Sequence, residues 1–424
     1  MIRFLLIGLL RDRSRSLFPV LMVSAGVFLT VVLYAYIKGM VGDMVDASAR
    51  FDTGHVKIVS RAYHLRESQA PNDLALLGVD DLLATIRTIH PRMVWTPRIR
   101  FGGLLDVPDA NGETRAQGPV AGLAIDLLNK DTPERNILKL DESLVRGRMP
   151  EQPDEILISE TFGRKLGVPL DKNVTLMSAT MYGSMTLHNF TVVGTVHFGM
   201  AALDRQLILV DINDAQRALD MTDGAGEILG FKPELDYADQ EMRILSQSFN
   251  RRFNSAEDEF SPIMHALSEK DLLGEILEMT NIGGGIIIAV FVFAMSIVLW
   301  NAGLMNGIRR YGEIGVRLAM GESKGDVYRS MIVEAVCIGI IGSVVGTIFG
   351  ILTAYWLQYH GLDFTDFMRQ STMLMSGVIR AKVTPFSYVI GFFPGLLASV
   401  IGTLFAGIGV FQRQTAQLFK ELEV

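Results

Sequence analysis

The sequence has little cysteine, little charge and no recognisable catalytic loop. Its 424 residues include one cysteine, Cys337, so no internal disulfide can form. Charged residues make up only 20%, against about 25% in an ordinary soluble domain. The net charge of −7 argues against a nucleic-acid binder, which needs a basic surface. Composition therefore points away from a soluble, disulfide-bonded or nucleic-acid-binding protein.

Motifs for nucleotides and metals are also missing from the sequence. No G-x-x-x-x-G-K-[ST] loop occurs, and the seven histidines include no H-E-x-x-H motif and no pair three or four residues apart. The segment 321–325 does match the G-x-S-x-G nucleophile elbow, but it lies in a loop of 26 residues, too short to hold a hydrolase sheet. We therefore predict no catalytic residue, no metal site and no cofactor in this chain.

Four long uncharged runs dominate what is present. Each is long enough to cross a bilayer core about 30 Å thick as a helix, which needs about 20 apolar residues. They are 17–37, 282–304, 335–357 and 386–411, and they predict transmembrane helices at 17–37, 282–304, 331–357 and 386–411. A buried core helix seldom stays uncharged for so long. The first run follows four arginines, but it is longer than a signal peptide and no small-x-small cleavage site follows, so we expect a retained anchor.

Basic residues in the short flanks predict the orientation. Segments 1–16, 305–330 and 412–424 carry four, five and two Lys or Arg residues, which predicts that they are cytoplasmic, together with both termini. The loop 358–385 and the segment 38–281 then lie on the opposite side. That long segment holds 25 basic and 37 acidic residues, as expected of an exported domain. The cytoplasmic segments total 55 residues, too few for a catalytic domain.

The fold class is thus an α-helical membrane protein with four transmembrane helices and a large mixed α/β extracytoplasmic domain between the first two. Strand-like runs occur at 55–60, 94–101, 155–159, 174–177, 190–196 and 206–210, and helical runs at 79–89 and 161–166, the latter ending at Gly167. This order predicts small packed modules and no large parallel sheet. Segments 38–50 and 268–281 have apolar faces and are expected either to form a two-helix stalk or to act as amphipathic linkers.

Small residues recur at four-residue spacing in the last two apolar runs. Such stripes allow close helix contact in lipid, so we predict that these faces pack against each other or against a second copy and do not form a substrate path. The predicted packing residues are Gly342, Gly346, Gly350, Gly391, Gly395 and Ser399.

The cytoplasmic loop 305–330 contains a short amphipathic pattern. Ile314 and Leu318 are four residues apart, Arg310 and Arg317 flank them, and Gly321 can end the helix. Composition leaves two interpretations open: a helix that docks into a groove of a cytoplasmic partner, or a connecting turn that lies on the lipid headgroups.

The segment 309–335 resembles the cytoplasmic signature of the FtsX-like permeases of ATP-binding cassette systems. The matching residues are Tyr311-Gly312-Glu313-Ile314-Gly315, then Leu318-Ala319-Met320-Gly321-Glu322-Ser323, then Glu334. Gly312 and Glu322 depart from the usual pattern. The segments 54–58 and 96–99, and the layout of one helix, a large external domain and three helices, extend the resemblance over most of the chain. Within this family the sequence is most similar to the lipoprotein-releasing permeases (LolC and LolE) and the permease portion of MacB.

The resemblance implies a permease subunit in the bacterial inner membrane. ATP and Mg would be bound by two separate ATPase subunits, and a second permease copy, identical or paralogous, is expected beside membrane lipids and a periplasmic lipoprotein carrier. The family implies contact with the ATPase at Arg310, Tyr311, Glu313, Ile314, Arg317, Leu318, Met320 and Gly321, and a membrane-entry glutamate at Glu334.

Three functions follow as expectations. Lipoprotein release from the inner membrane comes first. Mechanotransmission of the MacB or FtsX type, in efflux or cell-envelope regulation, is the alternative within the family. A membrane receptor with an external ligand-binding domain is the alternative from a different class, and the short cytoplasmic segments disfavour it.

Overall fold

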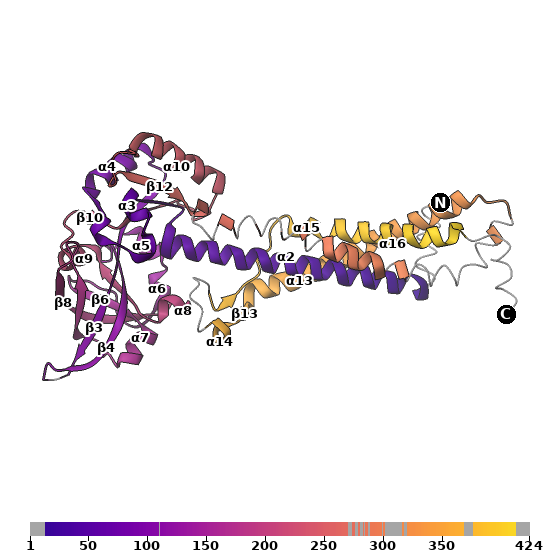
Figure 1. The fold of residues 1–424 in the computed structure, drawn as a ribbon. Helices are drawn as coiled ribbons and strands as arrows, with labels where there is room; N and C mark the ends of the chain where they lie inside the picture. Colours follow the sequence, from indigo (N-terminus) through magenta and orange to yellow (C-terminus); the bar gives the residue numbers. More distant parts are fainter. Residues whose placement is uncertain are drawn as a thin grey trace. The chain divides into compact units, whose positions relative to one another are not determined.

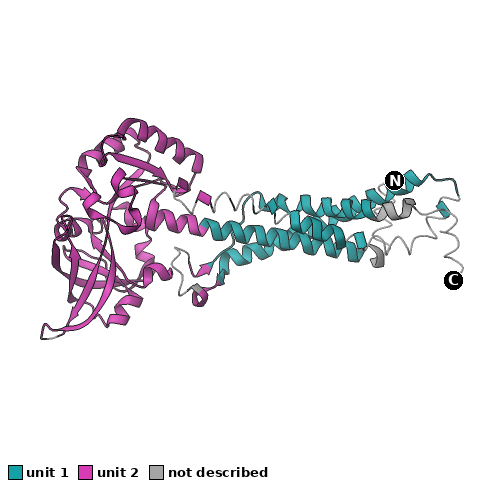
Figure 2. Ribbon diagram, in the orientation of Figure 1, with its two compact units in different colours: residues 1–42, 278–362, 379–424 teal, residues 43–277, 363–378 magenta. Residues whose placement is uncertain are grey.

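The computed structural model divides into two compact units (Figure 2). The helical unit comprises Met1–Gly42, Glu278–Leu362 and Ile379–Val424, and the sheet unit comprises Asp43–Leu277 and Asp363–Val378. The structure describes residues 13–109, 111–269, 274–275, 279, 283, 285–286, 289–298, 300–301, 316–317, 320–368 and 376–412.

The helical unit is built from long apolar helices (Figure 1). They are α2 (Arg13–Ser48), α13 (Lys324–His360), α15 (Ser387–Ile390) and α16 (Phe392–Gln412). Within the described residues three helical stretches have the length and composition to cross a membrane: Leu17–Thr53, Lys324–His360 and Ser387–Phe405. The chain is therefore a membrane protein.

The predicted span 282–304 lies partly outside the described residues. Its described part includes a shorter apolar helix, Ala289–Val298. The fourth transmembrane helix, and with it the predicted boundaries of the membrane segments, stays a prediction.

The sheet unit contains one ten-stranded mixed sheet. Its strand order is β12-β1-β11-β3-β4-β9-β6-β8-β5, and β7 pairs with both β3 and β8. Among the strand pairs of this sheet within the described residues, β4–β9 and β6–β8 are parallel and the others are antiparallel, so the expectation that there is no large parallel sheet is confirmed. The strands are β1 (Val56–Ser60), β3 (Val94–Pro108), β4 (Thr114–Ile125), β5 (Leu144–Gly147), β6 (Glu155–Ser159), β7 (Lys172–Ala179), β8 (Met185–Val196), β9 (Leu207–Asp211), β11 (Glu227–Phe231) and β12 (Pro262–Ala266).

The sequence predicts small packed modules; in the structure β3 joins two parts of one large sheet. The first five residues of β3 pair with β11, and the rest, from Ile99, pair with β4. The predicted strand 94–101 therefore continues to Pro108, through two glycines that a local pattern treats as a stop. Two small two-stranded sheets accompany the large one: β2 (Leu76–Leu77) with β10 (Gly224–Ala225), and β13 (Leu362–Asp363) with β14 (Val378–Ile379).

Short helices pack beside the strands. The periodicity at 79–89 correctly predicts α4 (Val79–Ile89), and α7 (Glu160–Leu166) ends at Gly167, whose φ is +65°. The others are α3 (Arg61–His64), α5 (Pro133–Ile137), α6 (Leu140–Ser143), α8 (Ala201–Asp204), α9 (Ile212–Leu219), α10 (Asp239–Phe253) and α14 (Thr365–Met368).

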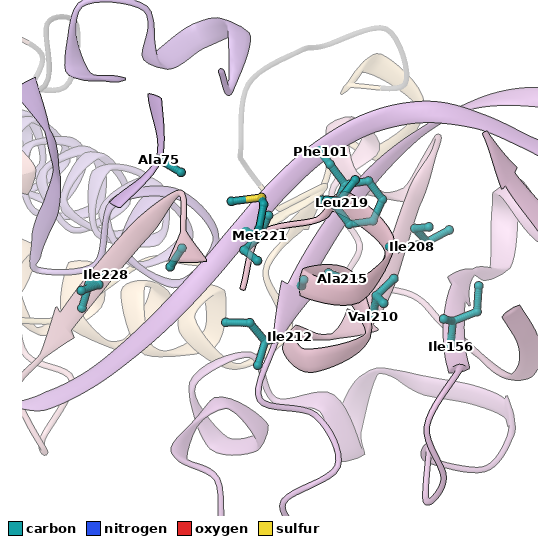
Figure 3. Close-up of a cluster of buried hydrophobic side chains, with 14 of the residues drawn as sticks. Ala75, Phe101, Ile156, Ile208, Val210, Ile212, Ala215, Leu219, Met221 and Ile228 are labelled. Carbon is teal, nitrogen blue, oxygen red and sulfur yellow. The ribbon is translucent and has the colours of Figure 1, made fainter. Parts of the chain in front are cut away.

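Every residue of β1, β6, β9 and β11 is buried, which explains why these strands are nearly continuous apolar runs. Their side chains join a single hydrophobic cluster with those of the neighbouring helices (Figure 3). In it Ile208 and Val210 of β9 lie near Ala215 and Leu219 of α9. This core keeps β3 and β11 rigidly placed.

Helix α2 continues from its apolar stretch into the predicted segment 38–50. The two-helix stalk, one of the two interpretations of this segment, requires such a helix. Helix α2 ends in a π-helical turn, Ala49–Thr53. The second predicted stalk segment, 268–281, lies mostly outside the described residues, after a short 3₁₀ turn, Leu267–Glu269. A paired stalk therefore stays a prediction.

Candidate functional site

The end of α2 is an unusual helix terminus inside the sheet unit. The π-helical turn Ala49–Thr53 closes when the Gly54 N–H donates to the Ala49 carbonyl at 2.9 Å. Gly54 has φ +61°, and a Cβ there would lie 2.7 Å from the Val56 carbonyl oxygen, so glycine is required. The last carbonyls of any helix lack partners within the helix and must find them elsewhere.

Two arginines of β3 supply these partners. Arg98 Nη1 donates to the Arg50 carbonyl at 2.6 Å. Arg100 Nη2 donates to the carbonyls of Phe51 and, at 3.2 Å, Asp52. Cations are favoured at a helix C-terminus because the peptide dipoles place partial negative charge there. The guanidinium groups thus attach the end of α2 directly to the central strand of the sheet.

A buried carboxylate fixes Arg98 in this position. Glu134 of α5 accepts two parallel hydrogen bonds from Arg98, each 2.8 Å long, and both side chains are fully buried. Thr96 Oγ1 donates to the same carboxylate at 2.6 Å. Such bidentate pairing needs the planar guanidinium, so lysine cannot replace Arg98 here.

A second buried carboxylate, Glu227 of β11, fixes Arg100. It lies 2.8 Å from Arg100 Nε and 2.8 Å from Lys57 Nζ of β1. Lys57 also pairs with Glu67 at 2.7 Å and Asp52 at 3.6 Å. Burial opposes ionisation of Glu227, but Arg100 and Lys57 outweigh it and hold the pKa of that carboxyl below its ordinary value.

The pKa of Lys57 is shifted in the opposite direction. Burial disfavours the ammonium, but Glu227 and Asp52 keep the pKa of Lys57 above its ordinary value. Lys57 and Glu227 are therefore both ionised at neutral pH. Together with Arg100 and the Arg98–Glu134 pair, they tie the end of α2 to β1, β3, β11 and α5 through charge-assisted hydrogen bonds, which are roughly twice as strong as neutral ones. We call these residues (Arg50 to Asp52, Lys57, Arg98, Arg100, Glu134 and Glu227) the helix-end network.

This network can transmit motion but shows no catalytic arrangement. No group of three or more His, Cys, Asp or Glu side chains that could hold a metal occurs among the residues that the structure describes. The carboxylates are occupied by cations, and removing one partner of a buried pair typically costs about 3 to 5 kcal/mol. A shift or rotation of the α2 end should therefore move the sheet with it.

Most of the predicted ATPase-contact residues lie outside the described residues: Arg310, Tyr311, Glu313, Ile314 and Leu318. Gly321 has φ +92°, the conformation of a helix stop, and the Glu322 N–H donates to the Arg317 carbonyl at 3.1 Å. Arg317 Nη1 also reaches Ser330 Oγ at 3.4 Å, and the Met320 side chain is exposed.

The following helix, α13, begins at Lys324, directly after the capping residue Ser323. Ser323 Oγ accepts from the Asp326 N–H at 3.2 Å and donates to the Asp326 carboxylate at 2.7 Å. Glu334 lies further along α13 and is half-buried.

The glycine stripes face the valines of α2. A Cβ built at Gly346 would lie 2.5 Å from the Ser24 carbonyl oxygen and 2.8 Å from Val27 Cβ. Gly342 and Gly350 face Val23 and Val31 in the same way, with 2.7 and 2.9 Å to the valine Cβ atoms.

The α16 stripe meets the same ridge of α2. A Cβ at Gly391 would lie 2.6 Å from Val27 Cγ1, and one at Gly395 would lie 2.6 Å from Val27 Cγ2. Ser399 Oγ donates to the Ala335 carbonyl of α13 at 2.8 Å. The two stripes therefore meet around α2, whose ridge the sequence analysis did not single out, although Val23, Val27 and Val31 recur every four residues.

The sequence analysis also missed the helix-end network, although it noted segments 54–58 and 96–99. The sequence does contain a signal. Lys57, Arg98 and Glu227 are charged residues in strands whose other residues are mostly apolar. Charged side chains are almost never fully buried unless paired, so such residues indicate buried pairs.

Comparison with known families decides the membership of the chain. Residues 16–233, more than half of the sequence, match the MacB-like periplasmic core domain, and residues 285–415 match the FtsX-like permease C-terminal domain. The chain belongs to the FtsX-like permeases with a MacB-like periplasmic core. The resemblance seen in the cytoplasmic loop is thereby confirmed.

Relatives of this permease include members of two named groups. The transmembrane protein LolC of the lipoprotein-releasing system from Haemophilus influenzae is 22% identical over 276 residues, 63% of each chain. The macrolide export ATP-binding/permease protein MacB from Neisseria meningitidis is 29% identical over 144 residues, 32% of this chain and 22% of that protein.

The permease also matches a crystal structure of the periplasmic region of MacB from Actinobacillus actinomycetemcomitans. The TM-score is 0.35 at 13% identity, covering 53% of this chain and 92% of that one. The match with LolC from Xylella fastidiosa spans 48% of that relative. The chain thus spans between about half and two thirds of the LolC relatives.

Proposed function

We propose that the chain is the permease subunit of an ATP-driven transporter in a bacterial inner membrane, with the domain 38–281 in the periplasm. A separate pair of ATPase subunits would bind ATP and Mg in the cytoplasm, and a second permease copy would complete the membrane part. The chain would contribute no catalytic residue of its own and would convert ATP-driven movement into movement of its periplasmic domain.

One observation carries this proposal: α2 passes without a break from its apolar stretch to the helix-end network. A helix rises about 1.5 Å per residue and is stiff over this length. Its last carbonyls are held by Arg98 and Arg100, which are themselves held by fully buried carboxylates. Helix α2 runs from Arg13 to Ser48 and leads directly into the turn Ala49–Thr53, which supports a mechanical role.

We propose lipoprotein release as the first candidate for the process that this movement drives, because relatives named for that system match over 63% and 48% of their length. A periplasmic lipoprotein carrier would then receive the cargo. The second candidate is MacB-like or FtsX-like mechanotransmission, in which no cargo enters the membrane part. It is supported by the match of 16–233 to the MacB-like core domain.

The contact with the ATPase would be made by the loop 305–330. Its described part favours a docked helix that ends at Gly321, since Gly321 adopts the left-handed conformation of a helix stop and Ser323 starts α13 immediately afterwards. Ile314 and Leu318 would fill the ATPase groove and Arg310 and Arg317 would flank it.

The transmission role is tested by changing the stiffness of α2. Replacing Met40 and Met44 by glycine destabilises the helical conformation by roughly 1 kcal/mol at each position relative to alanine. Replacing both by alanine removes the same side chains but keeps a high helix propensity. In a reconstituted complex, we expect the glycine pair to hydrolyse ATP but to lose most lipoprotein release per ATP, and the alanine pair to retain it. Equal coupling in the two variants would contradict the proposal.

A further inference from the structure

A cavity of about 650 Å³ lies beside the helix-end network, inside the sheet unit. Its volume is that of a small-molecule site. Phe101, Leu123 and Leu207 form an apolar part of its wall. Charged side chains also line the cavity, so it offers contacts for both an apolar and a charged group of a ligand.

The charged part of the wall is acidic in balance. Its described residues include four carboxylates and two permanently charged cations: Asp52, Glu67, Glu227, Glu269, Lys57 and Arg100. The two histidines, His64 and His265, stack with ring centres 3.8 Å apart. Burial, and then the neighbouring His64, lower the pKa of His265 to about 4, so it adds no positive charge at neutral pH. An excess of carboxylates favours a cationic ligand over an anion.

A buried hydroxyl in the same wall lacks a partner. Tyr63 is fully buried, and its Oη makes no hydrogen bond to any residue that the structure describes. Burial raises the pKa of Tyr63, so the hydroxyl is a neutral donor. An unsatisfied buried group of this kind costs about 1 to 3 kcal/mol.

Tyr63 is held in place through its backbone. It belongs to the single-turn helix α3, which Ser60 caps by accepting from the Tyr63 N–H at 3.0 Å. Ser60 Oγ in turn donates to the Leu74 carbonyl at 2.6 Å. His265 Nε2, also in the wall, is likewise without a partner among the described residues.

We propose that this cavity binds a small organic ammonium ion that carries an apolar group. The ammonium faces the carboxylates, of which Glu269 and Glu67 are the most accessible, with side chains 30% and 23% exposed. The apolar group lies against Phe101, Leu123 and Leu207, and Tyr63 donates to an acceptor that enters with the ligand. The site goes beyond the transmission role and does not depend on it.

The experiment is calorimetric titration of the purified full chain in detergent at pH 7 with three probes of one shape: phenethylammonium, 2-phenylethanol and phenylacetate. Titration into protein-free micelles corrects for partition. We expect saturable binding of phenethylammonium, at least about tenfold weaker binding of the alcohol, and none of phenylacetate, because loss of a charged contact is worth about 1.4 kcal/mol or more.

Two variants locate the site. Tyr63→Phe should weaken phenethylammonium binding by roughly three- to tenfold, since it removes one neutral hydrogen bond. Tyr182→Phe, an equivalent change at an exposed tyrosine outside this cavity, should leave it unchanged. Glu67→Gln should weaken the binding of phenethylammonium and leave the binding of 2-phenylethanol unchanged. The proposal is overturned if phenethylammonium shows no saturable binding, if the alcohol binds equally well, or if a folded Tyr63→Phe chain binds like the parent.

Discussion

Charged side chains in buried strands give this domain its most specific contacts. Arg98 and Glu134 are both fully buried, and they form a bidentate pair. Their value lies in position: Arg98 reaches the Arg50 carbonyl at the end of α2 only when Glu134 holds its other nitrogens. Lys57, Arg100 and Glu227 repeat this arrangement two residues further along β3.

Arg98→Met should destabilise the sheet unit by roughly 3 to 5 kcal/mol, because it leaves the Glu134 carboxylate buried without a cation. Adding Glu134→Met should recover part of this loss, since no buried charge then remains. Urea unfolding of the full chain in detergent measures both. A double variant no more stable than Arg98→Met would contradict the pairing.

Acid should weaken the domain through Glu155. Its bond to Arg148, followed by the backbone N–H groups of Glu151 and Gln152, lowers the pKa of Glu155 from 4.5 to about 2. A carboxyl with a lowered pKa contributes stability above its unfolded pKa, and this is lost as the pH falls from about 4.5 towards 2. We expect roughly 2 kcal/mol from this group, and Glu155→Gln should flatten that part of the stability profile. The exposed control Glu113→Gln should not.

At the scale of elements, α2 is the common partner of both glycine stripes. Val23, Val27 and Val31 are completely buried, and their branched side chains are stiff in a helix. Glycines on α13 and α16 let the backbones approach this ridge closely, which is the main source of helix association in lipid. The stripes therefore serve α2 packing within one chain.

Gly346→Ala should destabilise the helical unit by about 1 to 3 kcal/mol, because the new Cβ would lie 2.5 Å from the backbone oxygen of Ser24, which cannot turn aside. Val344→Leu enlarges a half-exposed position of the same helix and should change stability little. Thermal unfolding in detergent compares the two. Similar midpoints would show that α2 and α13 do not pack through Gly346.

At the scale of the whole molecule, the surface of the helical unit is typical of contact with lipid, and the burial pattern of the sheet unit is typical of contact with water. The helical unit buries small residues between helices and exposes large apolar side chains, such as Phe349 and Leu352, as lipid-facing helices do. The sheet unit buries a large set of apolar residues in a cluster away from water.

The predicted topology can be tested by cysteine labelling in a Cys337→Ser background. A cysteine at Asp141 should react with a membrane-impermeant maleimide added to intact spheroplasts, because the basic flanks predict that residues 38–281 lie outside the cytoplasm. A cysteine at Lys324 should react only after permeabilisation. The reverse pattern would invert the predicted topology.

Local sequence alone determined the apolar helices, several strands and the stop at Gly167, because each depends on neighbouring residues: an uncharged run, an apolar strand pattern or a glycine that adopts positive φ. It also determined the family, through the cytoplasmic motif. It could not determine that β3 joins two parts of one sheet, since strand pairing is set by segments far apart in the chain.

The contacts that matter most were decided by tertiary structure for the same reason. Arg98 finds Glu134 across 36 residues, Arg100 finds Glu227 across 127, and Gly346 meets Val27 from a different helix. A sequence can show that a charged residue in a buried strand needs an oppositely charged partner, or that a glycine stripe needs a row of larger side chains on another helix to pack against. Which partner it meets depends on how the chain brings distant segments together, because burial makes only satisfied pairings stable.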